Sequence, residues 1–153
     1  MSTAIETFQW RRFGELANTE LYALLKLRSE VFVVEQNCVF LDLDDHDERS
    51  EHLLMHDAQA NLIGYSRLLP PGEKYTEPSI GRVVVSPTVR ATGAGRRLMA
   101  ESVRGARERY PALPNLIWAQ HHLERFYMSF GFVTESEPEL EDGIPHVKMR
   151  LPA

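Results

Sequence analysis

The stretch VSPTVRATGAG, residues 85–95, joins a predicted strand to a predicted helix. The strand is expected over Ile80–Ser86, because this run is rich in β-branched residues and Pro87 stops it. The helix is expected to begin near Gly93 and to run to Tyr110. A strand, a glycine-containing turn and a helix in this order form a unit that can bind an anion at the start of the helix.

The turn Arg90–Gly95 has the chemistry of a phosphate site. The first N–H groups of a helix point toward an anion, and glycine lets a pyrophosphate approach because no Cβ is in the way. From Arg90 to Arg109 there are six arginines and two glutamates, a local charge of +4 in a chain of net charge −5. The alternative is that Gly93 and Gly95 only permit a tight turn. Neither the P-loop nor the dinucleotide-binding fingerprint matches, since no Gly-Lys pair occurs and residue 98 is leucine.

This segment resembles the coenzyme loop of the GCN5-related N-acetyltransferase (GNAT) superfamily, Gln/Arg-x-x-Gly-x-Gly/Ala after a strand that often reads Val-x-Pro. Residues 85–95 match every fixed position of that pattern. The second GNAT marker is a helix that ends in Phe-Tyr-x-x-x-Gly-Phe, and residues 126–132 read FYMSFGF. The two markers lie in the superfamily's order, one strand apart. A narrower resemblance, to the ElaA-like branch, is carried by the segments RSEVFVVEQ (28–36), IGRVVVS (80–86), AQH (119–121) and EDGIPH (141–146).

The resemblance covers essentially the whole chain and implies a fold of the α/β (α+β) class. The expectation is a single N-acetyltransferase domain over residues 1–153, with a mixed, mostly antiparallel twisted sheet flanked by helices. The sheet is expected to splay where Val83–Ser86 and Leu116–Gln120 diverge, with the coenzyme entering that gap. The other elements that the residues predict are strands over Ile5–Trp10, His52–His56, Leu62–Leu69, Leu116–Ala119, Phe132–Thr134 and His146–Leu151, and helices from Asn18 to about Val34 and over His122–Phe130.

The same resemblance implies an N-acetyltransferase that moves the acetyl group of acetyl-CoA directly to a primary amine, small-molecule or peptidyl, in a ternary complex. It gives Tyr127 the role of general acid toward the departing CoA thiolate; the alternative is a core aromatic residue on a helix. It also implies that Val83 and Val85 pair with the pantetheine arm through their backbone groups. The residues that the resemblance assigns to the CoA pyrophosphate are Arg90, Ala91, Thr92, Gly93, Ala94, Gly95 and Arg96.

The general base is not specified by these motifs. Many superfamily members place a glutamate on the strand before the coenzyme loop, but residues 80–83 read IGRV and contain no carboxylate. The candidates are Glu35, at the end of the first helix, and His121, at the end of a strand; imidazole titrates near neutrality. An exposed or structural role is the alternative for each, and His52 and His56 are weaker candidates. A water chain to bulk solvent can also carry the proton.

The composition argues against several other classes of protein. With 17 Lys plus Arg against 22 Asp plus Glu, the chain is a poor nucleic-acid binder. The single cysteine, Cys38, cannot form an internal disulfide. The first residues lack the pattern of a signal peptide, and no run approaches the ~18 apolar residues of a membrane span. We therefore expect a cytoplasmic protein that binds no membrane and no metal; whether it forms a homodimer is left open.

Two segments of the chain are rich in carboxylates. The segment Asp42–Glu51 lacks the glycine and the spaced glutamate of an EF-hand, so it is expected to be a solvated loop, with attraction of a cationic amine as its functional alternative. Residues 135–142 are expected to be solvated surface as well. Two rival functions remain: a non-catalytic acyl-CoA-binding module, in which Tyr127 has no role, and a structural or partner-binding domain without coenzyme affinity.

Overall fold

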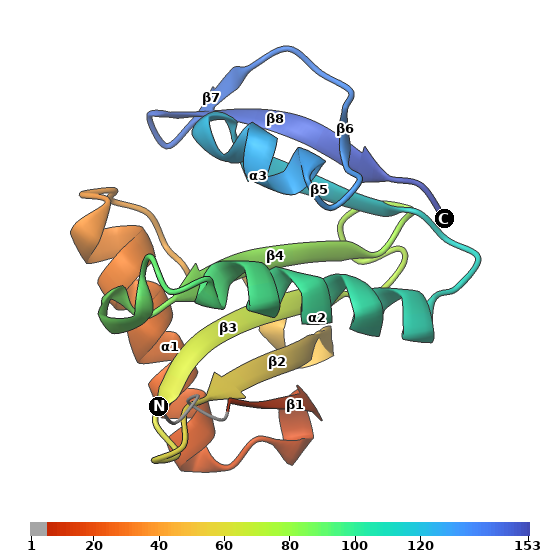
Figure 1. Cartoon of the computed structure of the whole chain (residues 1–153). Helices are drawn as coiled ribbons and strands as arrows, with labels where there is room; N and C mark the ends of the chain where they lie inside the picture. The colour runs from red at the N-terminus through yellow and green to blue at the C-terminus, as the bar shows by residue number, and fades with distance from the viewer. Residues whose placement is uncertain (1–5) are drawn as a thin grey trace.

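The structure is a computed structural model that describes residues 6–153 (Figure 1). Its strands are β1 (Thr7–Arg12), β2 (Glu51–His56), β3 (Leu62–Leu69), β4 (Ser79–Val85), β5 (Asn115–Gln120), β6 (Val133–Thr134), β7 (Glu139–Glu141) and β8 (Ile144–Leu151). Its α-helices are α1 (Asn18–Arg28), α2 (Ala94–Arg109) and α3 (Glu124–Met128). A π-helix over Ser29–Glu35 continues α1, and 3₁₀ turns cover Phe13–Glu15, Asp47–Arg49, Pro87–Val89 and His121–Leu123.

Most of these elements confirm the predictions made from the sequence. The first long helix is present, but its last seven residues are π-helical. The strand predicted over Ile5–Trp10 is found from Thr7 onward; Ile5 and the segment on which the signal-peptide prediction rests lie outside the described residues. Strand β7 is absent from the predictions, because its residues are acidic and exposed and therefore have the pattern of a surface loop.

The strands form two four-stranded sheets, ordered β1-β2-β3-β4 and β5-β8-β6, with β7 also paired to β8. The pairs recorded within both sheets are antiparallel. Strands β4 and β5 run in the same direction (Figure 1). They are bonded near their starts, where the Leu116 N–H donates to the Pro78 carbonyl at 3.1 Å and the Ile80 N–H donates to Asn115 Oδ1 at 3.0 Å. Beyond these bonds the two strands separate, as the expected splay requires.

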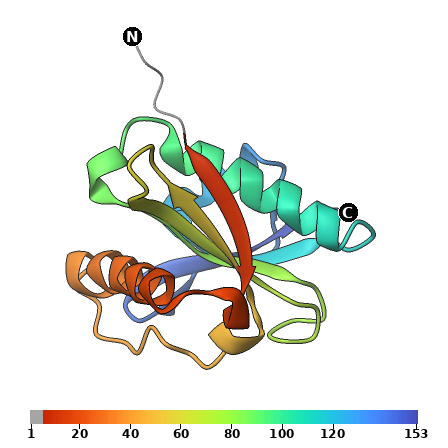
Figure 2. The same cartoon turned by 90° about the horizontal axis from the view of Figure 1, so that it is seen from below.

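Helices α1 and α2 cover opposite faces of the β1–β4 sheet (Figure 2). On one face, Leu24 of α1 packs with Tyr65 of β3 and Val84 of β4. On the other face, α2 packs through a stripe at helical spacing. The stripe residues Met99, Val103 and Ala106 are all buried.

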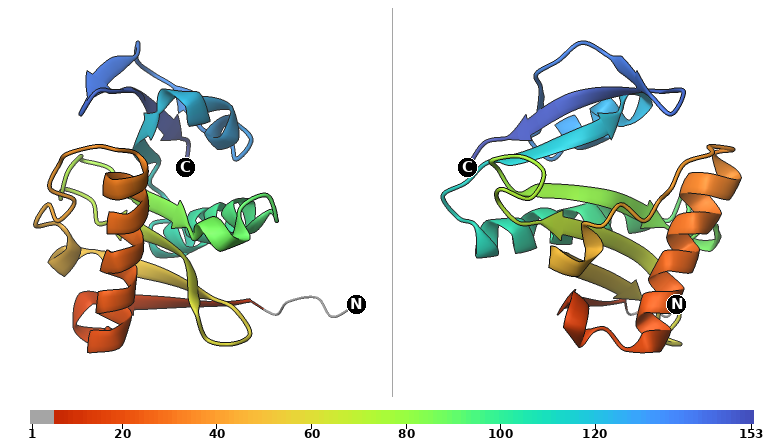
Figure 3. Two further views of the ribbon diagram at one scale, coloured as in Figure 1. Left: turned by 90° about the vertical axis from the view of Figure 1, so that its left-hand side faces the viewer. Right: turned by 180° about the vertical axis from the view of Figure 1, so that it is seen from behind.

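Helix α3 lies on the same side of the molecule as α2 (Figure 3). Its Tyr127 belongs to the core cluster that contains Ala119 of β5 and Val147 of β8. Successive residues of a strand point to opposite faces. The neighbours Gln120 and His146 therefore point to the face away from Tyr127. The β5–β8 sheet therefore presents Tyr127 to the gap on one face, and Gln120 and His146 on the other face.

The acidic segment after the π-helix is only partly solvated: Asp45 and Glu48 are exposed, but Asp42 and Asp47 are buried, so the prediction of a solvated loop is wrong for these two residues. Asp42 and Asp47 are only 4% and 8% exposed. The fully buried Arg28 binds both, with Nε 2.8 Å from Asp42 Oδ2 and Nη1 2.7 Å from Asp47 Oδ1. Arg67 pairs with Asp44 and Asp47 at 2.7 and 3.0 Å. Because arginines from α1 and β3 neutralise these carboxylates, they are not free to attract an amine.

His52 lies beneath this ion-pair network with no exposed surface. Its Nε2 is 2.8 Å from the Asp47 carbonyl, which can only accept, so Nε2 carries the proton. In the neutral ring, Nδ1 therefore accepts a hydrogen bond from the Tyr65 hydroxyl at 2.6 Å. Burial lowers the pKa of His52, and the nearby charges of Arg28 and Arg67 act in the same direction.

The burial of neutral His52 predicts a loss of stability on mild acidification. As the pH falls below about 6.5, the unfolded chain protonates this histidine while the native state does not, so the free energy of unfolding decreases. We expect urea denaturation to show this decrease between pH 7.5 and 5.5. His52→Gln should be less stable at pH 7.5 but should lack this pH-dependent component, whereas His56→Gln should retain it. An unchanged slope in His52→Gln would contradict the assignment.

Candidate active site

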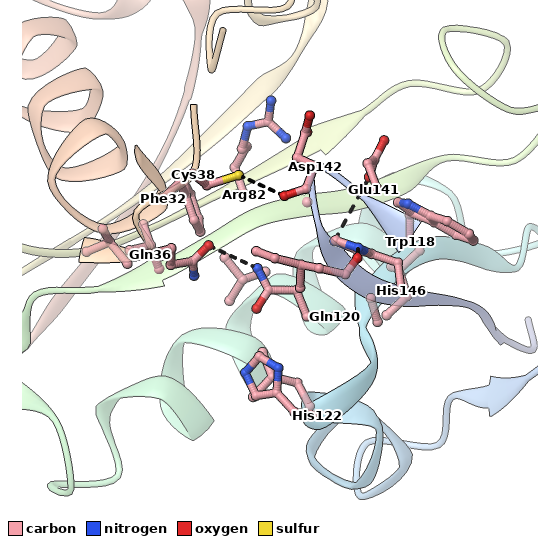
Figure 4. Close-up of a pocket in the computed structure, with 18 of the residues that line it drawn as sticks. Phe32, Gln36, Cys38, Arg82, Trp118, Gln120, His122, Glu141, Asp142 and His146 are labelled. Atoms are coloured by element: carbon pink, nitrogen blue, oxygen red, sulfur yellow. Dashed lines mark hydrogen bonds and ion pairs between the residues drawn. The ribbon is translucent and has the colours of Figure 1, made fainter. Parts of the chain in front are cut away.

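A cavity of about 440 Å³ occupies the gap between β4 and β5. Residues 80–85 of β4 form one wall and residues 117–120 of β5 the other. The end of the π-helix, the loop after it and the β7–β8 hairpin close the side shown in Figure 4. Tyr127 of α3 lines the cavity as well, together with His122 and Leu123 of the 3₁₀ turn before that helix. The cavity therefore connects the two faces of the β5–β8 sheet.

The wall formed by β4 has backbone groups available for a ligand. One edge of β4 pairs with β3, and that pairing shifts register opposite Arg82, whose φ is +50°. The resulting bulge bends the strand. The other edge separates from β5, so its N–H and C=O groups face the cavity. Val83 and Val85, predicted to pair with pantetheine, both line it.

The turn Arg90–Gly95 leads directly into α2. Ala91 and Gly93 have positive φ angles of 63° and 85°, which place the chain in the left-handed region just before the helix begins. The first N–H groups of a helix have no partner within the helix. A Cβ built at Gly95 would meet no atom within 4 Å, so space for a ligand lies beside this residue. The predicted phosphate-binding residues are therefore contiguous at one helix N-terminus.

The arginines of this segment differ in their surroundings. Arg90 lines the cavity and makes a bidentate ion pair with Glu35. Arg96 lies over the Phe130 ring, with its guanidinium carbon 4.9 Å from the ring centre, and it donates to Ser129. Both guanidinium groups are at least partly accessible at the start of α2. They can supply positive charge to an anion bound there.

Tyr127 lines the cavity from α3 and is 8% exposed. Burial raises the pKa of its phenol to about 12. Phe126 and Phe132 contact its ring edge-to-face, with centroids at 5.2 and 6.0 Å. Among residues 6–153, no side chain or backbone group makes a hydrogen bond with the Tyr127 hydroxyl. The hydroxyl is thus positioned by the packing of its ring alone.

The two predicted candidates for the general base both lie outside the cavity lining. The Arg90 guanidinium lowers the pKa of Glu35, chiefly through the bidentate hydrogen bonds, so this carboxylate is a poor proton acceptor. His121 has a 46% exposed side chain, and its Nε2 lies 4.0 Å from Glu124. The cavity is lined instead by His122 and His146.

Several cavity residues were not identified from the sequence. Gln36 and Gln120 bridge the gap at 3.2 Å, and Cys38 Sγ donates to the Asp142 carbonyl at 3.4 Å (Figure 4). Cys38 is buried, as its apolar sequence context indicates. Asp142 and the glycine after it have positive φ angles of 50° and 79°, typical of a two-residue hairpin. This Asp-Gly pair was the signal that could have identified β7 and the wall that it forms.

Arg82 connects the cavity to the buried ion-pair network. Its side chain lines the cavity, while its Nε lies 2.9 Å from Asp42 Oδ1 and its Nη2 lies 3.3 Å from Asp44 Oδ2. The Arg82 guanidinium also lies over the Phe40 ring, 5.8 Å from its centre. The bulge in β4 is therefore held in place by the same carboxylates that bind α1 and β3.

Residues 6–153 hold no cluster of three or more His, Cys, Asp or Glu side chains that is arranged to bind a metal ion. Over the same residues, none of the helices combines the length and the apolar character needed to cross a membrane.

Comparison with known proteins gives consistent matches over the length of the chain. A family model described as "Acetyltransferase (GNAT) domain" matches residues 32–153. A UPF0039 protein of Synechocystis is 41% identical over 142 residues, 93% of this chain and 92% of that protein. A Pseudomonas aeruginosa acyl-CoA N-acyltransferase structure has a TM-score of 0.91 at 38% identity and covers 97% of this chain and 100% of its own. Escherichia coli ElaA has a TM-score of 0.89, also at 38% identity, with coverages of 95% and 99%.

Proposed function

Because the chain belongs to the GNAT acetyltransferase family, we propose that it transfers the acetyl group of acetyl-CoA to a primary amine in the cavity between β4 and β5. One observation supports this proposal: the open edge of β4, Arg90 of the turn that precedes the N-terminus of α2, and Tyr127 all line the same cavity. CoA carries its reacting sulfur at one end of an extended pantetheine arm, and the other end of that arm joins the pyrophosphate, so the coenzyme needs all three features.

The residues present fit the parts of the coenzyme. Val83 and Val85 offer backbone groups to the pantetheine arm, as in the addition of a strand to a sheet edge. The N–H groups of Gly93–Arg96, together with Arg90, offer donors and positive charge to the pyrophosphate. The open space beside Gly95 is what an approaching phosphate needs. Bound in this way, acetyl-CoA would supply the thioester as the activated acetyl group.

Tyr127 is proposed as the general acid. Its side chain is 8% exposed at the cavity wall, and its hydroxyl makes no hydrogen bond within residues 6–153. A phenol with a pKa of about 12 stays protonated at neutral pH and can therefore donate to a thiolate that leaves beside it. The burial that raises the phenol pKa also disfavours a charged thiolate, so proton transfer and departure of sulfur are coupled.

The proposed amine acceptor is small or peptidyl, and transfer takes place directly, with both substrates bound. The cavity reaches both faces of the β5–β8 sheet, so two substrates can approach the gap from opposite sides. A non-catalytic acyl-CoA-binding module is the second candidate, since it would use the same β4 edge and α2 N-terminus. The free Tyr127 hydroxyl favours the enzyme.

The discriminating experiment has two steps. Thermal unfolding with and without acetyl-CoA tests the coenzyme site, and a thiol-release assay with a panel of primary amines tests transfer. An acetyltransferase gives both a thermal shift and amine-dependent release of CoA. A binding module gives the shift alone, and a protein that shows no shift with acetyl-CoA would refute both proposals.

A glutamate at Gly95 is expected to abolish the acetyl-CoA thermal shift. The shift itself should be roughly 5–10 °C at 100 times Kd, since such binding stabilises by about 2.7 kcal/mol. The position is open, so Gly95→Glu should fold, but its carboxylate would repel the pyrophosphate. Gly95→Ala is the matched control: the coenzyme-loop pattern accepts alanine at this position, so this variant should keep a shift and gain up to about 1 kcal/mol of stability from helix propensity. A folded Gly95→Glu protein with a normal acetyl-CoA thermal shift would contradict the assignment of the pyrophosphate site to this turn.

A further inference from the structure

We propose that Nε2 of His146 is the base that accepts the proton of the acceptor amine. This inference rests on the proposed acetyltransferase function and supplies the group that the sequence did not specify. His146 lies on β8, lines the cavity and has a side chain that is 12% exposed. Three features of its surroundings support the assignment: its tautomer, its fixed orientation and the face of the sheet on which it lies.

The tautomer of the neutral ring follows from one hydrogen bond. His146 Nδ1 lies 2.8 Å from the carbonyl oxygen of Ile144, two residues earlier on the same strand. A carbonyl oxygen can only accept, so Nδ1 must carry the hydrogen. The lone pair of the neutral ring is then on Nε2. Nε2 is therefore the nitrogen that can take a proton from a substrate.

The orientation of the ring is fixed by stacking. The His146 and Trp118 rings are nearly parallel, with an interplanar angle of 10° and a centroid separation of 5.7 Å. The tryptophan is on β5, the strand that forms one wall of the cavity. Together with the bond to the Ile144 carbonyl, this stacking holds the imidazole without using Nε2 (Figure 4).

The charges around Nε2 suit an amine. Glu141 of β7 has its Oε2 4.0 Å from Nε2, and Asp142 in the adjoining turn lines the same cavity. An ammonium group that reaches Nε2 therefore arrives beside carboxylates, and the ring can pair with Glu141 once it holds the proton. The cations near this corner include Arg82 of β4, which is engaged by Asp42 and Asp44, and Lys74, whose charge interacts with Glu141. Lys148 lies on the same face of β8 as His146, and its ammonium is 5.7 Å from the centre of the Tyr75 ring.

The position of His146 relative to Tyr127 suits a direct transfer. His146 points to the face of the β5–β8 sheet away from α3, whereas Tyr127 lies in the core cluster on the α3 face. Both residues line one cavity. An amine that attacks from the His146 side therefore has its leaving group on the Tyr127 side. The base and the acid act on opposite sides of the thioester carbonyl.

The protons and bonds of the reaction balance with these two groups. The ammonium gives one proton to Nε2 of His146, which passes it to solvent. The amine nitrogen forms a bond to the carbonyl carbon, and the bond between that carbon and sulfur breaks. The sulfur takes the Tyr127 hydroxyl proton. The nitrogen loses its second proton to solvent through Nε2 of His146 as well, and the phenolate takes one proton back from solvent. The products are an amide, CoA with a free thiol and one released proton.

The other histidines meet fewer of these conditions. His122 lines the cavity but is exposed, and within residues 6–153 it makes no hydrogen bond that would fix its tautomer. His121 is outside the cavity lining. His52 is fully buried in the ion-pair network, with both ring nitrogens engaged.

The kinetic test uses His146→Asn, because an asparagine amide can keep the donor to the Ile144 carbonyl while removing the base. The acceptor probes are phenethylamine, 1,4-diaminobutane and a lysine-containing peptide, assayed by thiol release. We expect kcat/KM for the amine to fall by about 10²–10³-fold at pH 7. The difference in kcat/KM between wild type and His146→Asn should become smaller as the pH rises toward the amine pKa, because the variant depends on amine that is already deprotonated. The acetyl-CoA thermal shift should not change, and His56→Gln should behave as wild type.

A spectroscopic measurement tests the same assignment without turnover. Two-bond ¹H–¹⁵N correlation spectra at pH 8 report the tautomer of each histidine, and the signal missing in His146→Asn identifies this ring. We expect the Nδ1–H tautomer. An Nε2–H tautomer, or wild-type kinetics in His146→Asn, would overturn the assignment of His146 as the base but not the proposed acetyltransferase function. A comparable loss in His121→Gln would also overturn it. A wild-type protein that acetylates none of the three probes would count against the proposed function itself.

Discussion

Replacing Tyr127 by phenylalanine is expected to lower kcat by about 10²–10⁴-fold, the usual contribution of general acid catalysis. This corresponds to roughly 3–5 kcal/mol of transition-state stabilisation. The ring contacts with Phe126 and Phe132 would persist, because only the hydroxyl is removed. That hydroxyl has no hydrogen-bond partner among residues 6–153, so its loss leaves no buried group unpaired. The melting temperature and the acetyl-CoA thermal shift should therefore stay close to wild type.

This combination separates catalysis from packing. If Tyr127 were only a core residue with a hydrogen-bonded hydroxyl, the phenylalanine variant would leave the hydrogen-bond partner of that hydroxyl unsatisfied. It would then lose about 1–3 kcal/mol of stability, and its activity would fall only in proportion to the unfolded fraction. Tyr110→Phe is a matched hydroxyl deletion at a residue outside the cavity lining, and it should change neither property. A fully active, normally stable Tyr127→Phe protein would remove Tyr127 from the mechanism.

An intermediate outcome is informative as well. Water can protonate a departing thiolate whose pKa is not far above neutrality. In that case Tyr127→Phe would lower kcat only a few-fold, and the deficit would grow at high pH. Steady-state measurements of wild type and variant between pH 6.5 and 9.5 distinguish this outcome from the larger, uniform loss expected for an essential acid.

The sequence predicted the parts of the fold that depend on local signals. The strand that Pro87 ends, the turn with Gly93 and the helix after it follow from backbone preferences of individual residues, and the structure has all three. The same is true of the strands predicted over His52–His56 and Leu62–Leu69, which the structure joins by a turn at residues 57–61. These features need no knowledge of which elements pack together.

The parts that could not be predicted depend on contacts between distant segments. Arg28 and Arg67 are separated from Asp47 by 19 and 20 positions, and no periodicity indicates that they would meet it. Without these partners, a run of carboxylates has the pattern of a solvated loop. The sequence does not mark His146 as a base for a related reason: its tautomer and orientation depend on the Ile144 carbonyl and on Trp118 of another strand.

Replacing Arg28 by methionine is expected to destabilise the protein by about 3–5 kcal/mol, the cost of leaving buried charges without their partner. Arg28 is fully buried and donates to both Asp42 and Asp47. Methionine fills a similar volume but leaves the Asp42 carboxylate, 4% exposed, with Arg82 as its remaining cation. For a chain of this length the melting temperature should fall by roughly 6–20 °C.

Arg104→Met is the matched control, because Arg104 also pairs with two carboxylates, Glu101 and Glu108, but on the exposed surface of α2. Exposed ion pairs contribute about 0–1 kcal/mol, so the free energy of unfolding of this variant should be close to that of wild type. Its small loss of stability should become smaller at high salt concentration, because salt screens exposed charges. If urea denaturation gave the two variants equal stabilities, the buried network would not be what holds α1, the acidic loop and β3 together. Because Asp42 also pairs with Arg82 at the cavity wall, the destabilised variant should in addition bind acetyl-CoA more weakly than Arg104→Met does.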